Sequence, residues 1–203
     1  MIAATALFAL VNPPLTPIMV SDYFRTGKLD REWVNIESAP GHLPRSLVAA
    51  EDANFCEHWG FDVAAIRAAS SSGSVRGGSS ISQQTAKNLL LWRGRSWVRK
   101  AIETPLTLLV EIFWTKRRIL EVYLNIIEFD HGVFGAVSAS RLYFDKEVSE
   151  LTELESARLA AILPNPKEWD ASSLPERLGD RAYRIVDGAR TIAADGRSNC
   201  FDP

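Results

Sequence analysis

The apolar residues of this chain recur at the spacing of an α-helix, and no segment shows the sustained alternation that marks a β-strand. The clearest example is the last expected helix, which follows Pro175 and should have a buried stripe. That stripe consists of Leu178, Ala182, Ile185, Ala189 and Ile192. The 203 residues suffice for one domain with its own core, and neither an internal repeat nor a second domain is visible. We therefore expect one mainly α-helical domain of about eight helices.

Hydroxyl residues mark where several helices should begin. Ser80 with Gln83, and Thr152 with Glu155, have the spacing of a capping box, in which each side chain bonds the backbone of the other residue. Thr115 can cap the segment 116–127. Local chemistry alone therefore predicts three helix starts.

Prolines divide much of the remaining chain. Residues 13–44 are punctuated by proline, and we expect them to be extended or loop. Pro44 suits the first position of a helix that should run to about Trp59. Pro105 should kink the helix expected over residues 97–114.

The charge balance and the cysteine content exclude two kinds of function. With 23 Lys and Arg against 25 Asp and Glu, the net charge is −2, so the chain lacks the basic field of a nucleic-acid-binding protein. Cys56 and Cys200 form no Cys-x-x-Cys pair, and the three histidines lie far apart in sequence, so no metal site is expected. Two lone cysteines are more often free thiols, unless the compartment is oxidising.

The first eleven residues, MIAATALFALV, are almost entirely apolar. A helix that spans a membrane needs roughly 17 to 25 such residues. No basic residue precedes the run and no clear cleavage site follows it, so a secretory signal peptide fits poorly. The run is either a buried N-terminal segment or the outer half of a membrane anchor whose first half is missing from this sequence.

A Ser/Gly segment, SSSGSVRGGSS (70–80), follows a short helix expected over residues 63–69. Its backbone N–H groups could cradle a phosphate, although flexible linkers of this composition are commoner and the Gly-Lys-Ser/Thr of a P-loop is absent. The helix after it places Gln84, Lys87 and Asn88 on one face. That face is either solvated or binds a sugar or a phosphate.

Residues 93–118 hold a local excess of positive charge in a chain of net charge −2. The basic residues are Arg93, Arg95, Arg99, Lys100, Lys116, Arg117 and Arg118. They form either a solvated face or a site for a diphosphate or an anionic membrane surface. Glu103 follows Arg99 by four residues, so an ion pair between them is expected on the helix surface.

Two adjacent acids, Glu51 and Asp52, follow the apolar residues 47–50 and open the stretch EDANFCEHWGFD. A carboxylate among apolar residues should have a raised pKa, which suits a general base that works near neutral pH. Asp52 can then hold an opposite charge or cap backbone groups. The alternative is a surface pair of acids at the first turns of a helix, stabilised by the helix dipole.

Several stretches of the chain match known motifs in the right order. EDANFCEHWGFD resembles Glu-Asp-x-x-Phe-x-x-His-x-Gly, GGSSISQQTAKN resembles Gly-Gly-Ser-Thr-x-Thr-Gln-Gln-x-x-Lys-Asn, and RKAIE resembles Arg-Lys-x-x-Glu. KRRILEVYLNIIEF and GVFGAVSASRLYF resemble the stretches that follow these motifs. Together they resemble glycosyltransferase family 51, the peptidoglycan glycosyltransferases, and most closely its monofunctional biosynthetic members. The match spans about residues 43–166.

The resemblance implies a lysozyme-like helical fold at a membrane surface and the polymerisation of lipid II into β-1,4-linked glycan strands. The growing lipid-linked chain would be the donor, and a new lipid II would supply the attacking 4-hydroxyl, with inversion and release of undecaprenyl diphosphate. Glu51 matches the general base, and Glu103 matches the second glutamate near the leaving diphosphate. The positions that match substrate-binding residues are Asp52, Phe55, Ser79, Gln83, Gln84, Lys87, Asn88, Arg95 and Arg99. Lys87, Arg95 and Arg99 are those that match contacts to phosphate.

The same resemblance implies a location and a set of partners. Residues 1–20 would be a partial single-pass anchor in the cytoplasmic (inner) membrane, and residues 21–203 would be the glycosyltransferase domain on its periplasmic side. The partners would be lipid II, the growing lipid-linked glycan chain and other cell-wall synthesis proteins, with no nucleic acid. No tightly bound cofactor is implied, although a divalent cation, Mg or Mn, can accompany the diphosphate. Because that compartment is oxidising, Cys56 and Cys200 are predicted to form a disulfide.

Some positions depart from the family pattern. Ser80 and Ser82 stand where the pattern has threonines, which keeps the hydroxyl groups, whereas Pro105 can alter the aim of the nearby catalytic glutamate. Asp130 and His131 stand where we expect a glycine and an aspartate. No Ser-x-x-Lys motif is present, so the chemistry of penicillin-binding transpeptidases is excluded. Two rival functions remain: a lysozyme-like hydrolase that cuts finished glycan, and a catalytically silent protein that binds lipid II.

Overall fold

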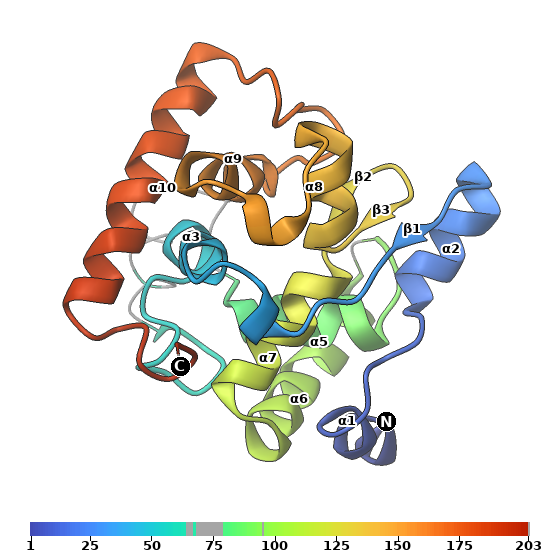
Figure 1. Cartoon of the computed structure of the whole chain (residues 1–203). Coiled ribbons are helices and arrows are strands. Elements are labelled where there is room, and N and C mark those ends of the chain that lie inside the picture. Colours follow the sequence, from blue (N-terminus) through green and yellow to red (C-terminus); the bar gives the residue numbers. More distant parts are fainter. Residues whose placement is uncertain (64–66, 68–78, 95, 203) are drawn as a thin grey trace.

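The computed structural model describes residues 1–63, 67, 79–94 and 96–202 of the chain (Figure 1). The α-helices within these ranges are α1 (Ile2–Phe8), α2 (Pro17–Thr26), α3 (His42–Glu51), α5 (Ile81–Leu90), α6 (Trp97–Phe113), α7 (Lys116–Ile126), α8 (Ala136–Phe144), α9 (Glu153–Ile162) and α10 (Glu176–Ala194). Two short 3₁₀ helices, η1 (Ile36–Ser38) and η2 (Val148–Glu150), lie between them. The expectation of a mainly α-helical, lysozyme-like domain is confirmed.

Two groups of helices make up most of the molecule. α3, α9 and α10 pack against one another, and α5 packs against both α6 and α7. Figure 1 shows the first group around the long α10 and the second group below it. All five residues of the predicted stripe on α10 are buried, which confirms that helix and its inward face. Glu51 lies on α3, four of the predicted site residues lie on α5, and Arg99 and Glu103 lie on α6, so the predicted site draws on both groups.

The three helix starts predicted from capping residues are confirmed. The Ser80 hydroxyl accepts from the N–H of Gln83 at 3.2 Å, and the Gln83 side chain accepts from the N–H of Ser80 at 3.0 Å. Thr152 and Glu155 make the same reciprocal pair at the start of α9. Thr115 caps α7. These bonds satisfy backbone donors that the first turn of a helix leaves without partners.

The helix that carries Glu51 is shorter than predicted. α3 ends at Glu51 rather than near Trp59, because Asp52 leaves the helical conformation with φ −162° and ψ 67°. Its carboxylate then contacts His58 and the backbone of Ile81, which a continued helix would prevent. α3 also begins at His42, so Pro44 lies inside its first turn rather than at its first position.

Residues 13–44 contain a helix that the sequence analysis did not predict. α2 begins at Pro17, and the Thr16 hydroxyl accepts from the N–H of Met19 at 3.2 Å. A capping threonine followed by proline is a helix-start signal, and the density of prolines in this region concealed it. Met19 is fully buried, so α2 contributes to the core.

Pro105 lies inside α6, which continues without a break to Phe113. The hydroxyl of Thr107 donates to the carbonyl oxygen of Glu103 at 2.9 Å, one turn back. Most of the helix expected over residues 63–69, and most of the Ser/Gly segment before α5, lie outside the described residues.

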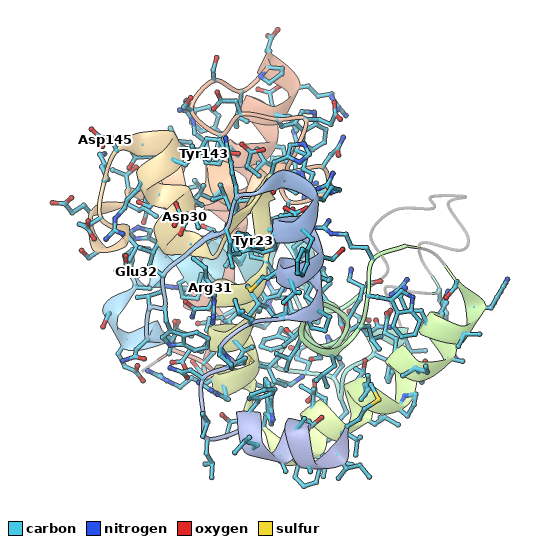
Figure 2. The ribbon with its side chains drawn as sticks, turned by 90° about the vertical axis from the view of Figure 1, so that its right-hand side faces the viewer. Tyr23, Asp30, Arg31, Glu32, Tyr143 and Asp145 are labelled. Carbon is cyan, nitrogen blue, oxygen red and sulfur yellow. A yellow bond between two sulfur atoms is a disulfide. The ribbon has the colours of Figure 1, made fainter. Side chains whose placement is uncertain are left out.

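A small sheet, which was not predicted, stands beside α8. Its strands β1 (Asp30–Arg31), β3 (Val133–Phe134) and β2 (Glu128–Asp130) lie in that order, with β1 parallel and β2 antiparallel to β3. Gly132, in the β2–β3 turn, has φ +73°, and an added Cβ would lie 2.7 Å from the Lys28 carbonyl oxygen. Figure 2 looks onto this side of the molecule and labels Asp30 and Arg31 of β1. Strands this short give no alternating pattern long enough to detect in sequence.

The N-terminal segment is attached to α6 and α7 by polar contacts. The indole N–H of Trp114 donates to the carbonyl oxygen of Thr5 at 2.7 Å, and the guanidinium of Arg118 donates to the carbonyl oxygens of Phe8 and Val11. Thr5 is buried, whereas the side chain of Leu10 is 90% exposed. Among the described residues we find no helix both long and apolar enough to cross a bilayer.

A disulfide joins Cys56 to Cys200, as predicted, across 144 positions of sequence. It ties the C-terminal residues to the loop that follows Glu51. Next to it the rings of Phe55 and Phe201 lie 6.3 Å apart, and Arg197 donates to the Ala53 carbonyl oxygen at 3.4 Å. The loop after α3 is therefore held covalently and by packing.

Candidate active site

Glu51 is the last residue of α3, and its side chain is 16% exposed. Oε2 accepts a hydrogen bond of 3.0 Å from Nε2 of Gln84 on α5, and Oε1 lies 3.7 Å from the guanidinium of Arg181 on α10. Burial raises the pKa of Glu51, as predicted from its apolar neighbours. The Gln84 hydrogen bond and the charges of Arg181 and Lys87 offset this rise only in part.

Asp52 has a different environment from the glutamate next to it. Its side chain is 2% exposed; Oδ1 lies 2.7 Å from Nε2 of His58, and Oδ2 accepts from the N–H of Ile81 at 2.9 Å. Because Ile81 is the first residue of α5, this bond fixes the start of α5 to the end of α3. The alternative of a surface acid pair at the first turns of a helix is therefore wrong, and Asp52 positions the helix that carries Gln84.

A pocket of about 440 Å³ opens beside Gln84. Its walls are formed by Ile18, Gln84, Lys87, Asn88, Trp92, Arg93, Gly94, Arg99, Tyr123, Ile126, Ile127, Glu128, Phe134 and Leu163. Gln84, Lys87 and Asn88 all line it, which confirms that they share one face of α5. Three cationic side chains, of Lys87, Arg93 and Arg99, face this space, so it suits an anionic group.

Glu103, on α6, is tied to one of these cations. Oε2 of Glu103 accepts from Nη1 of Arg99 at 2.7 Å, which confirms the predicted pair. The Nε of Arg99 also donates to the Gly94 carbonyl oxygen at 2.7 Å, so the guanidinium is held at both sides. Burial lowers the pKa of Lys87, while the negative charges of Glu103 and Glu51 act to raise it. Lys87 therefore experiences the fields of both glutamates.

The basic stretch 93–118 divides into two parts with different roles. Arg93 and Arg99 reach the pocket, whereas Lys116 and Arg117 pair with Glu111 and Glu37, each at 2.7 Å. Arg118 pairs with Glu121 and holds the N-terminal segment. The second half of the stretch is therefore structural.

Four predicted substrate-binding residues do not line this pocket in the described structure. Phe55 is fully buried, with Lys116 4.5 Å from the centre of its ring. Gln83 caps α5, and Ser79 is exposed just before that helix. Asp52 is buried as described above. Arg95 lies outside the described residues, and contact of any of these residues with a substrate stays a prediction.

The serines that stand for threonines both make buried contacts. Ser80 donates to the Gly60 carbonyl oxygen and Ser82 donates to the carboxylate of Glu111. Each hydroxyl therefore performs a structural role that threonine could also fill.

Asp52, His58 and Asp62 bring one potential metal-ligand atom each within 4.8 Å of one another, but both Asp52 oxygens already contact protein donors.

Three side chains of the site were not singled out individually from the sequence. Tyr123 and Arg93 line the pocket, and Arg181 faces Glu51 from α10. In the sequence, Tyr123 is one of several large residues on the inner face of α7, and no pattern distinguishes it from core residues. No sequence motif connects Arg181 to Glu51. Arg93 was noted only as part of a basic stretch; its position depends on Asp22 and Glu128, which lie 3.3 and 2.8 Å from its guanidinium.

Together these groups can support a displacement with an anionic leaving group. A buried carboxylate with a raised pKa can take a proton near neutral pH. Cationic side chains of the pocket, Lys87 on α5 and Arg99 on α6, can stabilise negative charge as it develops. Both requirements are met by residues of α3, α5 and α6.

Comparison with known proteins gives one consistent answer. Residues 19–190 match the family described as Transglycosylase. A protein of Jannaschia sp. (strain CCS1), named biosynthetic peptidoglycan transglycosylase, is 50% identical over 194 residues, which cover 96% of this chain and 81% of that protein. Proteins of the same name from Caulobacter vibrioides and Cronobacter sakazakii are 44% and 45% identical, covering 98% and 96% of this chain and 89% and 86% of their own lengths.

Proposed function

The chain belongs to the transglycosylase family and is a peptidoglycan glycosyltransferase, and we propose that it polymerises lipid II into β-1,4-linked glycan strands. The donor is the growing chain on its lipid diphosphate, and the acceptor is a new lipid II. The observation that carries the proposal is the position of Gln84 and Lys87 on one face of α5, where they link a buried base to a cationic pocket.

In the proposed reaction Glu51 is the general base. Its carboxylate takes the proton of the acceptor 4-hydroxyl while that oxygen attacks the anomeric carbon of the donor. The bond from this carbon to the diphosphate oxygen breaks at the same time, and the diphosphate leaves with the electron pair. Attack opposite to the leaving group inverts the anomeric centre. The raised pKa of Glu51 supports this role, because a base with a pKa nearer to the working pH transfers protons more effectively.

The cations of the pocket stabilise the leaving diphosphate. The Gly94 carbonyl oxygen and Glu103 hold the guanidinium of Arg99, so it needs no rearrangement when negative charge builds up, and Lys87 lines the same pocket. Glu103 holds Arg99 in place through their 2.7 Å contact. Arg95 is proposed as a further phosphate contact from the family pattern. Mg or Mn can assist at the diphosphate, and no tightly bound cofactor is proposed.

A lysozyme-like hydrolase is the alternative reaction for a pair of carboxylates in a helical domain. The cationic pocket disfavours it, since a glycosidic leaving group carries no diphosphate for Lys87 and Arg99 to bind. A protein that only binds lipid II would have no use for the raised pKa of Glu51.

One experiment separates the three functions. The purified protein is incubated with labelled lipid II, and the product is examined before and after digestion with lysozyme. Lipid II polymerase activity gives a long product that lysozyme cuts. If the protein fragments finished glycan and leaves lipid II unchanged, the hydrolase is correct; if lipid II is bound and recovered intact, the silent binder is correct.

We further propose that residues 1–20 belong to an N-terminal membrane anchor and that the catalytic domain works on the periplasmic side of the cytoplasmic membrane, with other cell-wall synthesis proteins as partners. The exposed side chains of Ile2, Leu7 and Leu10 support contact with a bilayer. A triple change of these three residues to serine keeps the polar attachments of the segment. It should weaken binding to liposomes, whereas Tyr183→Ser, on the exposed face of α10, should not. Equal liposome binding by the triple variant would refute the anchor.

A further inference from the structure

Tyr123 is a fully buried side chain of α7 whose hydroxyl has a specific partner. The ring belongs to the hydrophobic core, yet the hydroxyl donates to Oε1 of Gln84 at 3.1 Å. Gln84 in turn donates to the carboxylate of Glu51. A chain of two hydrogen bonds therefore connects the core of α7 to the last residue of α3.

The amide of Gln84 is fixed in one orientation by three contacts. Its oxygen accepts from Tyr123, and its nitrogen donates to Glu51 at 3.0 Å and to the Ser79 carbonyl oxygen at 3.4 Å. If the amide were turned over, its oxygen would face the oxygens of Glu51 and Ser79, and no donor would lie between them. The amide nitrogen therefore has two acceptors on one side, and the oxygen has a donor on the other.

The Tyr123 hydroxyl, which donates to the Gln84 amide oxygen, stays protonated. Burial raises the pKa of the Tyr123 phenol well above its usual range, and the negative charges of Glu51 and Asp52 raise it further. The phenol therefore stays protonated wherever the protein is folded at ordinary pH, and it keeps its hydrogen for Gln84.

We infer that Tyr123 is a positioning residue for catalysis, because its hydroxyl holds the Gln84 amide so that the amide N–H always faces Glu51. This inference deepens the proposed function and rests on Glu51 acting as the base. Donation from Gln84 stabilises the ionised carboxylate and opposes the effect of burial. Tyr123 thereby keeps the base in the form that can accept a proton, with Oε2 bonded to the amide and Oε1 on the side of Arg181.

Other charged groups that face Glu51 would remain when the hydroxyl is removed. They are Arg181 from α10, Lys87 from α5 and Asp52 beside Glu51. Tyr123→Phe alters none of them and keeps the ring in the core. A change in the titration of Glu51 in this variant therefore reports the hydrogen-bond chain.

The test combines two measurements on wild-type protein and Tyr123→Phe. The first follows the pKa of Glu51 by NMR of isotope-labelled glutamate side chains without substrate, with Glu51→Gln used to assign the signal. We expect the Tyr123→Phe pKa to lie higher by about half a unit to one unit, the equivalent of one lost hydrogen bond. The second is the pH profile of kcat/KM with lipid II, whose acidic limb should move to higher pH by the same amount. At pH values on the acidic limb, kcat should fall by up to about tenfold, with KM changed less than about twofold.

Two controls separate positioning from packing. Tyr143→Phe removes a hydroxyl that donates to the Phe129 carbonyl oxygen at 2.9 Å, far from α3 in sequence, and should leave the Glu51 titration in place (Figure 2). In a Gln84→Met background, Tyr123→Phe should have no further effect on the Glu51 pKa. An unchanged Glu51 pKa in Tyr123→Phe overturns the inference, whatever happens to kcat. Because that titration needs no substrate, it decides the inference even if wild-type protein fails to polymerise lipid II.

Discussion

The two glutamates of the site stand in contrasting surroundings. Glu51 ends α3, receives one neutral amide donor at 3.0 Å, and has its nearest guanidinium 3.7 Å away. Glu103, in the middle of α6, contacts the guanidinium of Arg99 at 2.7 Å. Glu103 therefore fixes a cation, whereas Glu51 has a neutral donor and its pKa is raised by burial. The difference supports the proposed division of roles, with proton transfer at the α3 end of the site and positioning of a cation at the α6 end.

The largest effect is expected from Glu51→Gln. Glutamine keeps the size and hydrogen bonding of the side chain but cannot accept a proton, so kcat should fall by about 10² to 10⁴. The thermal midpoint should hold or rise near neutral pH, because a carboxylate whose pKa is raised by burial opposes folding when it is ionised. Steady-state rates with lipid II and thermal melts measure both quantities.

The control for this change is Glu153→Gln, which alters an exposed pair with Arg190 and should keep near wild-type activity. Near wild-type polymerisation by Glu51→Gln would mean that another group is the base. Inactivity caused by failure to fold would show as a lowered midpoint and would equally remove the argument for Glu51.

A smaller effect is expected from Glu103→Gln. The variant frees Arg99 from its ion pair, so the guanidinium is no longer held beside the pocket. We expect kcat to fall by about 10 to 10² and KM to rise, because both the bound and the leaving diphosphate lose a fixed cation. A fall in kcat as large as that of Glu51→Gln, with KM unchanged, would erase the contrast between the two glutamates.

The contrast extends to pH. Activity should decline about tenfold per pH unit once the pH falls below the raised pKa of Glu51, because the base is then protonated.

The stability of the fold depends on other carboxylates. Burial alone would raise the pKa of Asp22, but hydrogen bonds from Arg25 and Gly132 and the charges of Lys167 and Arg93 lower it to about 2.

Because the folded pKa of Asp22 lies below its ordinary value of 3.8, its contribution to stability is present above that value and is lost as the pH falls toward about 2. Activity should therefore disappear at a higher pH than the folded state. Circular dichroism and kcat/KM measured over the same pH series test this order. Coincident loss of both signals would show that acid acts on the fold rather than on Glu51.

The smallest effect on turnover is expected from removing the disulfide in the double variant Cys56→Ala/Cys200→Ala. The free energy of unfolding should fall by about 2 to 4 kcal/mol, because the unfolded chain regains freedom. The α3 end should lose less than about fivefold in kcat, since Asp52 still bonds to Ile81 and His58. A loss comparable to that of Glu51→Gln would mean that the covalent tie itself aims the base.

Local chemistry explains what could be predicted from the sequence. The caps at Ser80, Thr115 and Thr152 depend on residues three positions apart, and the inward stripe of α10 depends on helical spacing. Both features could therefore be predicted from the sequence. The face shared by Gln84, Lys87 and Asn88 follows from the same spacing. The pairing of Cys56 with Cys200 came from the resemblance to a family that works in an oxidising compartment.

Tertiary contacts explain what could not be predicted. α3 ends at Glu51 because the Asp52 carboxylate accepts a hydrogen bond from the N–H of Ile81. No residue pattern within 42–60 predicts that partner. The contact of Arg181 with Glu51 depends on how α10 packs, and that of Tyr123 with Gln84 depends on how α7 packs. Sequence motifs therefore indicated the proposed reacting groups, whereas the side chains that contact them became visible only in the fold.

The disulfide has a consequence for how the protein is made. Its two cysteines lie 144 positions apart, one in the loop next to Glu51 and one near the end of the chain. Synthesis must therefore reach residue 200, and the thiols must meet an oxidant, before that loop can be closed. A product interrupted by a late nonsense codon, after α10 but before Cys200, would contain every motif residue and every described helix, yet its first motif would lack the covalent tie. Maturation of the first motif thus waits until Cys200, made 144 positions after Cys56, has left the ribosome.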